Sequence, residues 1–267
     1  MLFDISGKKF YPCAMSGHFI SIGPWDFLLI VVVSVQATIL AYIFNPKLKA
    51  FVLSFPFPFT IASLALGRRV DATNALGLID LLLFTHGVRI LNSRWRVPIV
   101  PSIVIAAVSY CIIGWIVAKL VPSGDLVFWS SCLLVVLVGL IAVKKFPYRE
   151  DAPYRTALPV FIKLPIIMAV VIILVIIKKG LGGFMTVFPM VGVIAVYEGR
   201  SMLSSMCRQI PGIMITLVGL MMVARLTYGT LGLAGSLVAG WAAFLLVLKP
   251  INRWVWETGI DAEIHQE

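Results

Sequence analysis

The stretch LVFWSSCLLVVLVGLIAVKK, residues 126–145, indicates the fold class, because it is apolar as far as residue 143 and then ends on two lysines. An α-helix needs about 20 apolar residues to cross the hydrocarbon core of a bilayer. Lysines directly after such a run are typical of helix ends that lie among lipid headgroups. The stretch therefore predicts a membrane-spanning helix.

The same pattern recurs on both sides of this stretch. Of the 267 residues 60% are hydrophobic and 13% are charged, whereas soluble domains are about 45 to 50% apolar. We therefore expect an all-α fold, a polytopic transmembrane helical bundle of about nine spans. The nine predicted spans are residues 27–44, 50–66, 73–91, 98–121, 126–143, 160–177, 182–197, 206–224 and 230–248.

The polar segments divide the chain into predicted units. These are an N-terminal interfacial segment at 1–26, a first four-span unit at 27–121, a linker helix and polar loop at 122–159, a second four-span unit at 160–248, and a C-terminal tail at 249–267. Internal prolines in the segments 50–66 and 182–197 leave open whether these two are full spans or re-entrant, broken helices.

The formal net charge of +10 comes from short Lys and Arg clusters between the apolar runs. Such clusters indicate a lipid bilayer, and not a nucleic acid, as the partner. The larger share of the 22 basic residues falls on the side of the C-terminus, which predicts a cytoplasmic C-terminus in the inner membrane of the cell. The four cysteines are isolated and there are three histidines, so we expect no metal and no cofactor. A homo-oligomer is left open.

An internal repeat links the two predicted units. LKAFVLSFPFPFTIA at 48–62 aligns with LGGFMTVFPMVGVIA at 181–195, and both contain Phe-Pro. Because five spans separate the two copies, the second unit would be inverted in the membrane, as in many secondary transporters. The alternative is that two apolar helices resemble each other by composition alone.

The second unit also resembles a known family. FMTVFPMVGVIAVYEGR, an apolar span ending in Arg225, and GSLVAGW are similar to the small inner-membrane proteins of the GlpM type. The resemblance covers about residues 160–248, with a weaker copy in the N-terminal half, where Ser109 and Tyr110 depart from the glycine-serine pattern. It implies a membrane location and a helical unit, and it implies no particular activity.

Polar residues inside the third span are candidates for a transport site. Asp80 lies midway along its apolar run, where a charged carboxylate costs at least about 2.5 kcal/mol. It should therefore face protein or water and be protonated or paired. His86 and Arg89 share a helix face. We interpret Asp80 as a coupling carboxylate and the His-Arg pair as an anion or relay site, or all three as structural residues.

The Phe-Pro breaks, Phe55, Pro56, Pro58, Phe188 and Pro189, are further transport-site candidates. Proline frees a backbone carbonyl one turn earlier, so a break can offer backbone dipoles to a solute, or it can simply kink the helix. We expect the two breaks to lie near each other around a cavity. A gate or anion site, or else a salt-bridged loop, is predicted from a group of polar residues, Glu198, Arg200, Arg208 and Gln209.

These features favour a secondary transporter or flippase of a small solute, ion or lipid. The alternative is a non-catalytic membrane subunit or scaffold that needs a partner. The sequence contains no HExxH, no GxSxG and no paired membrane aspartates, so we expect no enzyme activity.

Overall fold

The computed structural model describes residues 23–145, 158–177 and 183–264. Over these residues the chain forms helices and no strand. The helices are α1 (Pro24–Tyr42), α2 (Pro46–Leu53), α3 (Phe57–Leu66), α4 (Ala72–Ser93), α5 (Ile99–Leu120), α6 (Asp125–Lys145), α7 (Val160–Ile177), α8 (Phe184–Val187), α9 (Met190–Glu198) and α10 (Leu203–Ile264). Among the described residues, six helical stretches, with α2 and α3 taken as one, are long and apolar enough to cross a membrane. The protein is thus a helical membrane protein.

Local sequence sets where the helices begin and end. The Asn45 side chain accepts hydrogen bonds from the amides of Lys47 and Leu48 at the start of α2, where Pro46 costs no hydrogen bond. Asp71 caps α4 in the same way. α3 ends at Gly67, whose φ of 63° lies in the left-handed region that glycine adopts without a Cβ clash.

Two helical segments are broken at Phe-Pro, and the breaks have similar backbones. Pro56, before α3, has φ −84° and ψ 39°, and Pro189, before α9, has φ −74° and ψ 49°. The carbonyl of each proline accepts a hydrogen bond from the amide four residues later, Thr60 in one case and Val193 in the other. Both breaks follow from the missing proline amide.

α10 is a hairpin of two antiparallel arms. Its backbone turns at Gly232, with φ 65° and ψ −174°, a conformation that is essentially restricted to glycine. The arms approach closely, because a Cβ on Gly240 would lie 2.8 Å from the carbonyl oxygen of Leu220. The predicted end of one span at 224 and the predicted start of the next at 230 are therefore wrong. The chain stays helical there and turns inside the predicted ninth span.

Hydrogen bonds between helix ends show that these ends lie in two groups, one at each end of the bundle. At one end of the bundle the Tyr42 hydroxyl donates to the carbonyl of Leu158, so the end of α1 lies beside the start of α7. Arg208, near the start of α10, donates to the carbonyls of Val143 in α6 and Val255 in the second arm of α10. We call this the Arg208 end.

At the other end, Arg225 donates to Asp125, the first residue of α6, at 2.6 Å, and to the carbonyl of Val70 just before α4. The side-chain amide of Asn74 in α4 donates to the carbonyl of Gly183, which precedes α8. We call this the Arg225 end.

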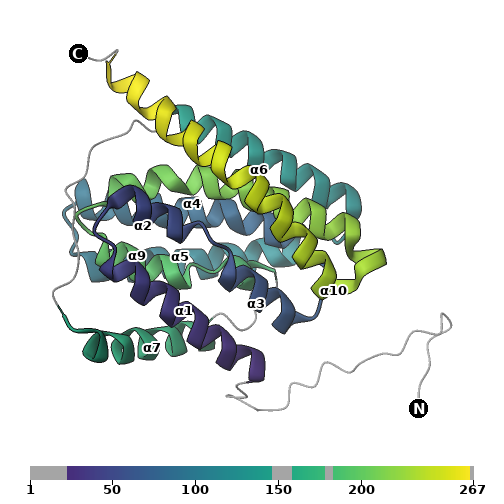
Figure 1. Ribbon diagram of the computed structural model, residues 1–267, viewed down its shortest axis with the longest axis horizontal. Coiled ribbons are helices and arrows are strands. Elements are labelled where there is room, and N and C mark those ends of the chain that lie inside the picture. Colours follow the sequence, from purple (N-terminus) through teal and green to yellow (C-terminus); the bar gives the residue numbers. More distant parts are fainter. Residues whose placement is uncertain (1–22, 146–157, 178–182, 265–267) are drawn as a thin grey trace.

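The helices pack into two apolar cores. One core joins α1, α5, α7 and α9, and the other joins α4, α6 and both arms of α10. The two broken segments pack against each other between the cores, with α3 against α8 and α2 against α9. Figure 1 shows α6 and α10 along one side of the molecule and α1 and α7 along the opposite side.

Most predicted spans match helices, and the differences lie at their ends. The spans at 98–121, 126–143 and 160–177 correspond to α5, α6 and α7 within two residues. The predicted tail at 249–267 is instead helical as far as Ile264, because Val255 and Trp256 bury against the first arm of α10. The interfacial segment 1–26 and the polar loop at 144–159 lie mostly outside the described residues.

Candidate functional site

The two Phe-Pro breaks line one small cavity, as the repeat predicted. Its volume is about 80 Å³. Phe55 and Pro56 come from the first broken segment, Phe188 and Pro189 from the second, and Pro58 also contributes. Other walls come from α4, through Leu81 and Thr85, and from the first arm of α10. We call this space the break cavity.

Polar side chains from neighbouring helices bind the carbonyls at each break. Gln36 of α1 donates to the carbonyls of Val52 and Phe55, each at 3.2 Å. In a continuous helix the Val52 carbonyl would accept from the amide of residue 56, but Pro56 has no amide hydrogen. At the second break the Tyr110 hydroxyl of α5 donates to the carbonyl of Phe184 at 3.1 Å. Gln36 also lines the break cavity, where its Oε1 meets no hydrogen-bond partner among the described residues.

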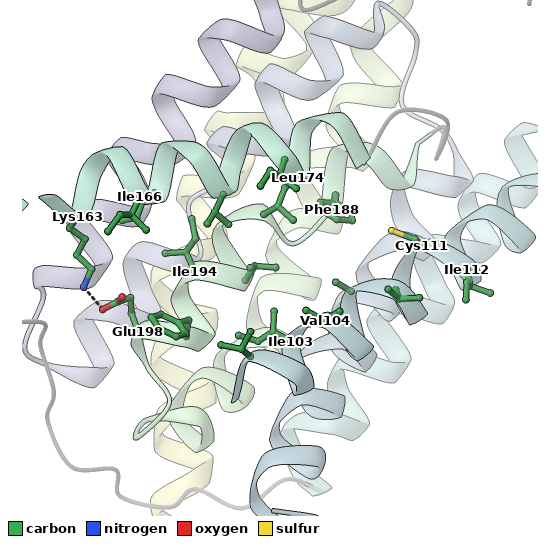
Figure 2. A pocket seen from close by; sticks show the side chains of 18 of the residues that line it. Ile103, Val104, Cys111, Ile112, Lys163, Ile166, Leu174, Phe188, Ile194 and Glu198 are labelled. Atoms are coloured by element: carbon green, nitrogen blue, oxygen red, sulfur yellow. Dashed lines mark hydrogen bonds and ion pairs between the residues drawn. The ribbon is translucent and has the colours of Figure 1, made fainter. Parts of the chain in front are cut away.

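A much larger groove lies between α5 and α7, with α9 at its base. Its volume is about 1020 Å³, and its walls are almost wholly aliphatic and aromatic. Residues on its α5 side, such as Val104 and Ile112, are more than half exposed, so this side of the bundle is accessible to lipid. Phe188 lines both the groove and the break cavity. We call this space the lateral groove (Figure 2).

One end of the lateral groove is charged. Lys163 of α7 and Glu198 of α9 form an ion pair at 2.6 Å, although each is about 95% buried. Figure 2 shows this pair at one end of the groove and Cys111 and Ile112 at the other. A buried pair of this kind is costly to desolvate, and it is retained where it has a specific use or where its geometry is good.

Asp80 is buried in the protein, as predicted, with 2% of its surface exposed. Its Oδ2 has no hydrogen-bond partner among the described residues. It lies close enough to Tyr110 and Cys111 to interact with both electrostatically. Tyr110 binds the carbonyl of Phe184 and Cys111 lines the lateral groove, so Asp80 sits beside one residue of the groove and one that supports the second broken segment.

His86 and Arg89 are placed less favourably for a shared site with Asp80. His86 is buried, and its Nδ1 lies 3.2 Å from the carbonyl of Leu82 in its own helix. Arg89 is close enough to His86 to interact with its charge, as expected for residues three apart. Neither residue lines the break cavity or the lateral groove.

The group predicted as a gate does not come together. Glu198 pairs with Lys163, whereas Arg200 is exposed and lies over the Tyr197 ring. Arg208 binds backbone carbonyls of α6 and α10. Gln209 donates to Ser54 and Asn252 and accepts from Trp256. Of the four, only Glu198 lines either of the two spaces described above.

Lys163, Gln36 and Tyr110 are site residues that sequence reasoning missed. A signal existed for each, because a lysine, a glutamine and a tyrosine stand inside otherwise apolar runs. Within the described residues there is no group of three His, Cys, Asp or Glu side chains that could hold a metal ion. The arrangement offers apolar walls, one buried ion pair and two irregular backbone segments.

Comparison with known proteins gives no match to a family model, to a curated protein or to a solved structure. The resemblance of residues 160–248 to the GlpM type therefore stays a prediction.

Proposed function

We propose that the chain is a secondary transporter or flippase of a lipid-like solute. The observation that carries this proposal is the juxtaposition of two proline-broken helical segments, one from each predicted unit, around the break cavity. Transporters place their sites where such discontinuous helices meet, because the breaks offer backbone groups and can adjust. The lateral groove, which shares Phe188 with this cavity, offers a path for a solute that arrives through the lipid.

An inverted repeat is part of the proposal. Residues 133 positions apart, Pro56 and Pro189, have matching backbone angles and matching hydrogen bonds. Corresponding helices also have corresponding neighbours. α4 packs on α8 as α10 packs on α2, and α5 packs on α9 as α10 packs on α3. The contacts of α3 with α8 and of α2 with α9 fit two segments related by a two-fold axis in the membrane plane.

Nine crossings are also proposed. Helix ends alternate between the Arg208 end and the Arg225 end of the bundle. This alternation fits nine successive crossings, in which α2 and α3 together form one crossing, α8 and α9 form another, and each arm of α10 forms one. The remaining crossings are α1, α4, α5, α6 and α7. The distribution of basic residues favours the Arg208 end, with the C-terminus, on the cytoplasmic side of the inner membrane. Transport then corresponds to rocking of one unit against the other.

Reconstitution into liposomes tests the proposal. The purified chain should accelerate the movement of fluorescent lipids between the two leaflets, measured by quenching the outer leaflet with dithionite. Pro189→Ala should reduce this rate, because it allows the helix to continue through the break. Pro250→Ala is the matched control, since Pro250 is exposed, stands inside α10 and does not line the break cavity.

Two results would contradict the proposal. Equal rates in Pro189→Ala and the unchanged protein would remove the break from the mechanism. No movement of lipid or of solute by a well-folded chain would favour the alternative, a membrane subunit that needs a partner.

A further inference from the structure

Two charged side chains line one end of the lateral groove, and a third lies near them. Lys163 and Glu198 line the groove and pair at 2.6 Å. Lys49 of α2, 1% exposed, does not line the groove, but it lies close enough to both for their charges to interact. The described side chains of this cluster are therefore two cations and one carboxylate. We call them the lysine cluster.

The lysine cluster lies where helices end, whereas the groove extends along the helices. Glu198 is the last residue of α9, and Lys163 is in the first turn of α7. The Lys163 ammonium lies 6.0 Å from the centre of the ring of Tyr42, which is the last residue of α1. On α5 the groove runs from Val100 to Trp115, about 22 Å at the helical rise. One leaflet has a hydrocarbon depth of about 15 Å, so the groove can hold a lipid chain along its length.

We propose that the lateral groove binds an anionic lipid, with its apolar chain against α5, α7 and α9 and its phosphate or carboxylate headgroup beside Lys163, where the charge of Lys49 also acts. This inference names the substrate of the transporter proposed above and rests on that function. In a buried site, an ammonium group at the headgroup and a second one close behind it attract an anion strongly, because the effective dielectric constant is low. Glu198 is the resident counter-ion, so a headgroup competes with it for Lys163.

Other ligand classes use only part of this site. A small soluble anion would use the lysines and leave the apolar walls without a role. A neutral or zwitterionic lipid would use the walls but would gain less from two cations. The combination of an apolar groove with a cationic end fits a molecule that carries both a chain and a negative charge.

Binding to the purified full chain tests the inference separately from transport. The probes are oleoyl lysophosphatidic acid, which has chain and anionic phosphate, oleoyl lysophosphatidylcholine, which has the same chain on a zwitterionic headgroup, and inorganic phosphate, which has no chain. Native mass spectrometry in a neutral detergent measures their affinities. We expect oleoyl lysophosphatidic acid to bind at least about fivefold more tightly than oleoyl lysophosphatidylcholine. Inorganic phosphate should not displace it.

Two variants of the lysine cluster should shift affinity in opposite directions. Lys49→Gln should weaken the binding of oleoyl lysophosphatidic acid about fivefold. Glu198→Gln should strengthen it, because the competing carboxylate is gone. Misfolding cannot produce both results, since it would weaken binding in each case. Arg253→Gln, which removes a charge from an exposed residue of α10, should leave the affinity unchanged.

The apolar part of the groove is tested by Ala107→Trp, which fills its α5 wall and should lower the affinity for both lysolipids. Val238→Trp is the control, because Val238 is 70% exposed on α10 and lies outside the groove. Equal affinities for the two lysolipids, displacement by inorganic phosphate, or shifts of the same sign in the Lys49 and Glu198 variants would each overturn the inference. Selective binding without lipid movement in liposomes would support the lipid site and contradict the transporter function. Lipid movement without headgroup selection would support the transporter function and contradict the anionic-lipid site.

Discussion

Two buried polar side chains, Arg208 and Asp80, differ in how far their hydrogen bonds are satisfied. Arg208 is 2% exposed and makes three hydrogen bonds, at 2.7 to 3.1 Å, to the carbonyls of Val143 and Val255. Asp80 is equally buried, and its Oδ2 has no such partner among the described residues. A side chain whose hydrogen bonds are satisfied stabilises the fold, whereas an unsatisfied buried carboxyl calls for a functional explanation. The two residues should therefore respond differently to substitution.

Asp80→Asn should abolish lipid or solute movement driven by a pH gradient while the protein stays folded in the membrane. The swap keeps the size and polarity of the side chain and removes its titration. Because the buried Oδ2 accepts no described hydrogen bond, we expect the thermal midpoint to change by less than about 4 °C, which corresponds to about 1 kcal/mol. Liposomes with an imposed pH gradient provide the measurement. If gradient coupling persists in this variant, Asp80 has no part in the mechanism, and His86 becomes the next residue to substitute.

Arg208→Gln should lower the free energy of unfolding by about 1.5 to 3 kcal/mol, the range for hydrogen bonds made by a charged group. The shorter side chain cannot reach both α6 and the second arm of α10. Arg200→Gln is the matched control, because Arg200 is exposed and such changes stay within about 0.5 kcal/mol. Unfolding of both variants in detergent checks this expectation. Equal stability of the two would show that Arg208 does not hold these helix ends together.

At the scale of elements, single residues decide where helices stop, bend or turn back. Pro56 and Pro189 break two segments, and Gly67 ends α3. Gly232 reverses α10 through a backbone conformation with φ 65° and ψ −174°, and a Cβ there would meet no other residue within 4 Å. The requirement for glycine at this turn is therefore conformational and not one of space.

Gly232→Ala should destabilise the hairpin by about 1 to 3 kcal/mol, because residues with a Cβ rarely adopt this conformation. Gly229→Ala is its control, three residues earlier in the same helix, where a Cβ also meets open space and the backbone is helical. That change should leave stability unchanged or raise it by about 0.5 to 1 kcal/mol. Thermal unfolding of the two variants decides the matter. A loss of stability in both would instead point to crowding of this region in the membrane.

At the scale of the molecule, the hydrogen bonds at the Arg208 and Arg225 ends hold segments that are far apart in sequence. Arg225 and Asp125 are 100 residues apart, and Arg208 and Val143 are 65 residues apart. The lateral groove opens between α5 and α7. A homo-oligomer, left open by the sequence, stays a prediction.

The proposed crossings predict that the two ends of the bundle face opposite sides of the membrane. Ser93→Cys is at the Arg208 end, at the last residue of α4, and Gly124→Cys is at the Arg225 end, directly before α6, and both positions are exposed. A membrane-impermeant maleimide should label Gly124→Cys in intact cells and Ser93→Cys only after permeabilisation. The unchanged protein, with its native cysteines, gives the background. Labelling of both from one side would contradict the crossing pattern, and the reverse result would contradict only the predicted orientation.

The membrane class, most helix positions and both breaks could be predicted from the sequence, because these depend on local properties. The length of an apolar run specifies a spanning helix, and a missing proline amide interrupts a helix wherever it occurs. The meeting of the two breaks at one cavity was also expected, on the basis of the predicted repeat. The turn at Gly232 was misplaced, since a single glycine in an apolar run is compatible both with a helix and with a reversal.

The lateral groove and the lysine cluster depended on the tertiary structure alone. Lys49, Lys163 and Glu198 come from three helices, and nothing in their sequence spacing indicates that they meet. The groove exists because α5 and α7 both pack against α9 and leave a space between them. Such features arise from how side chains far apart in sequence fit together, and local hydrophobicity or propensity carries no information about that fit.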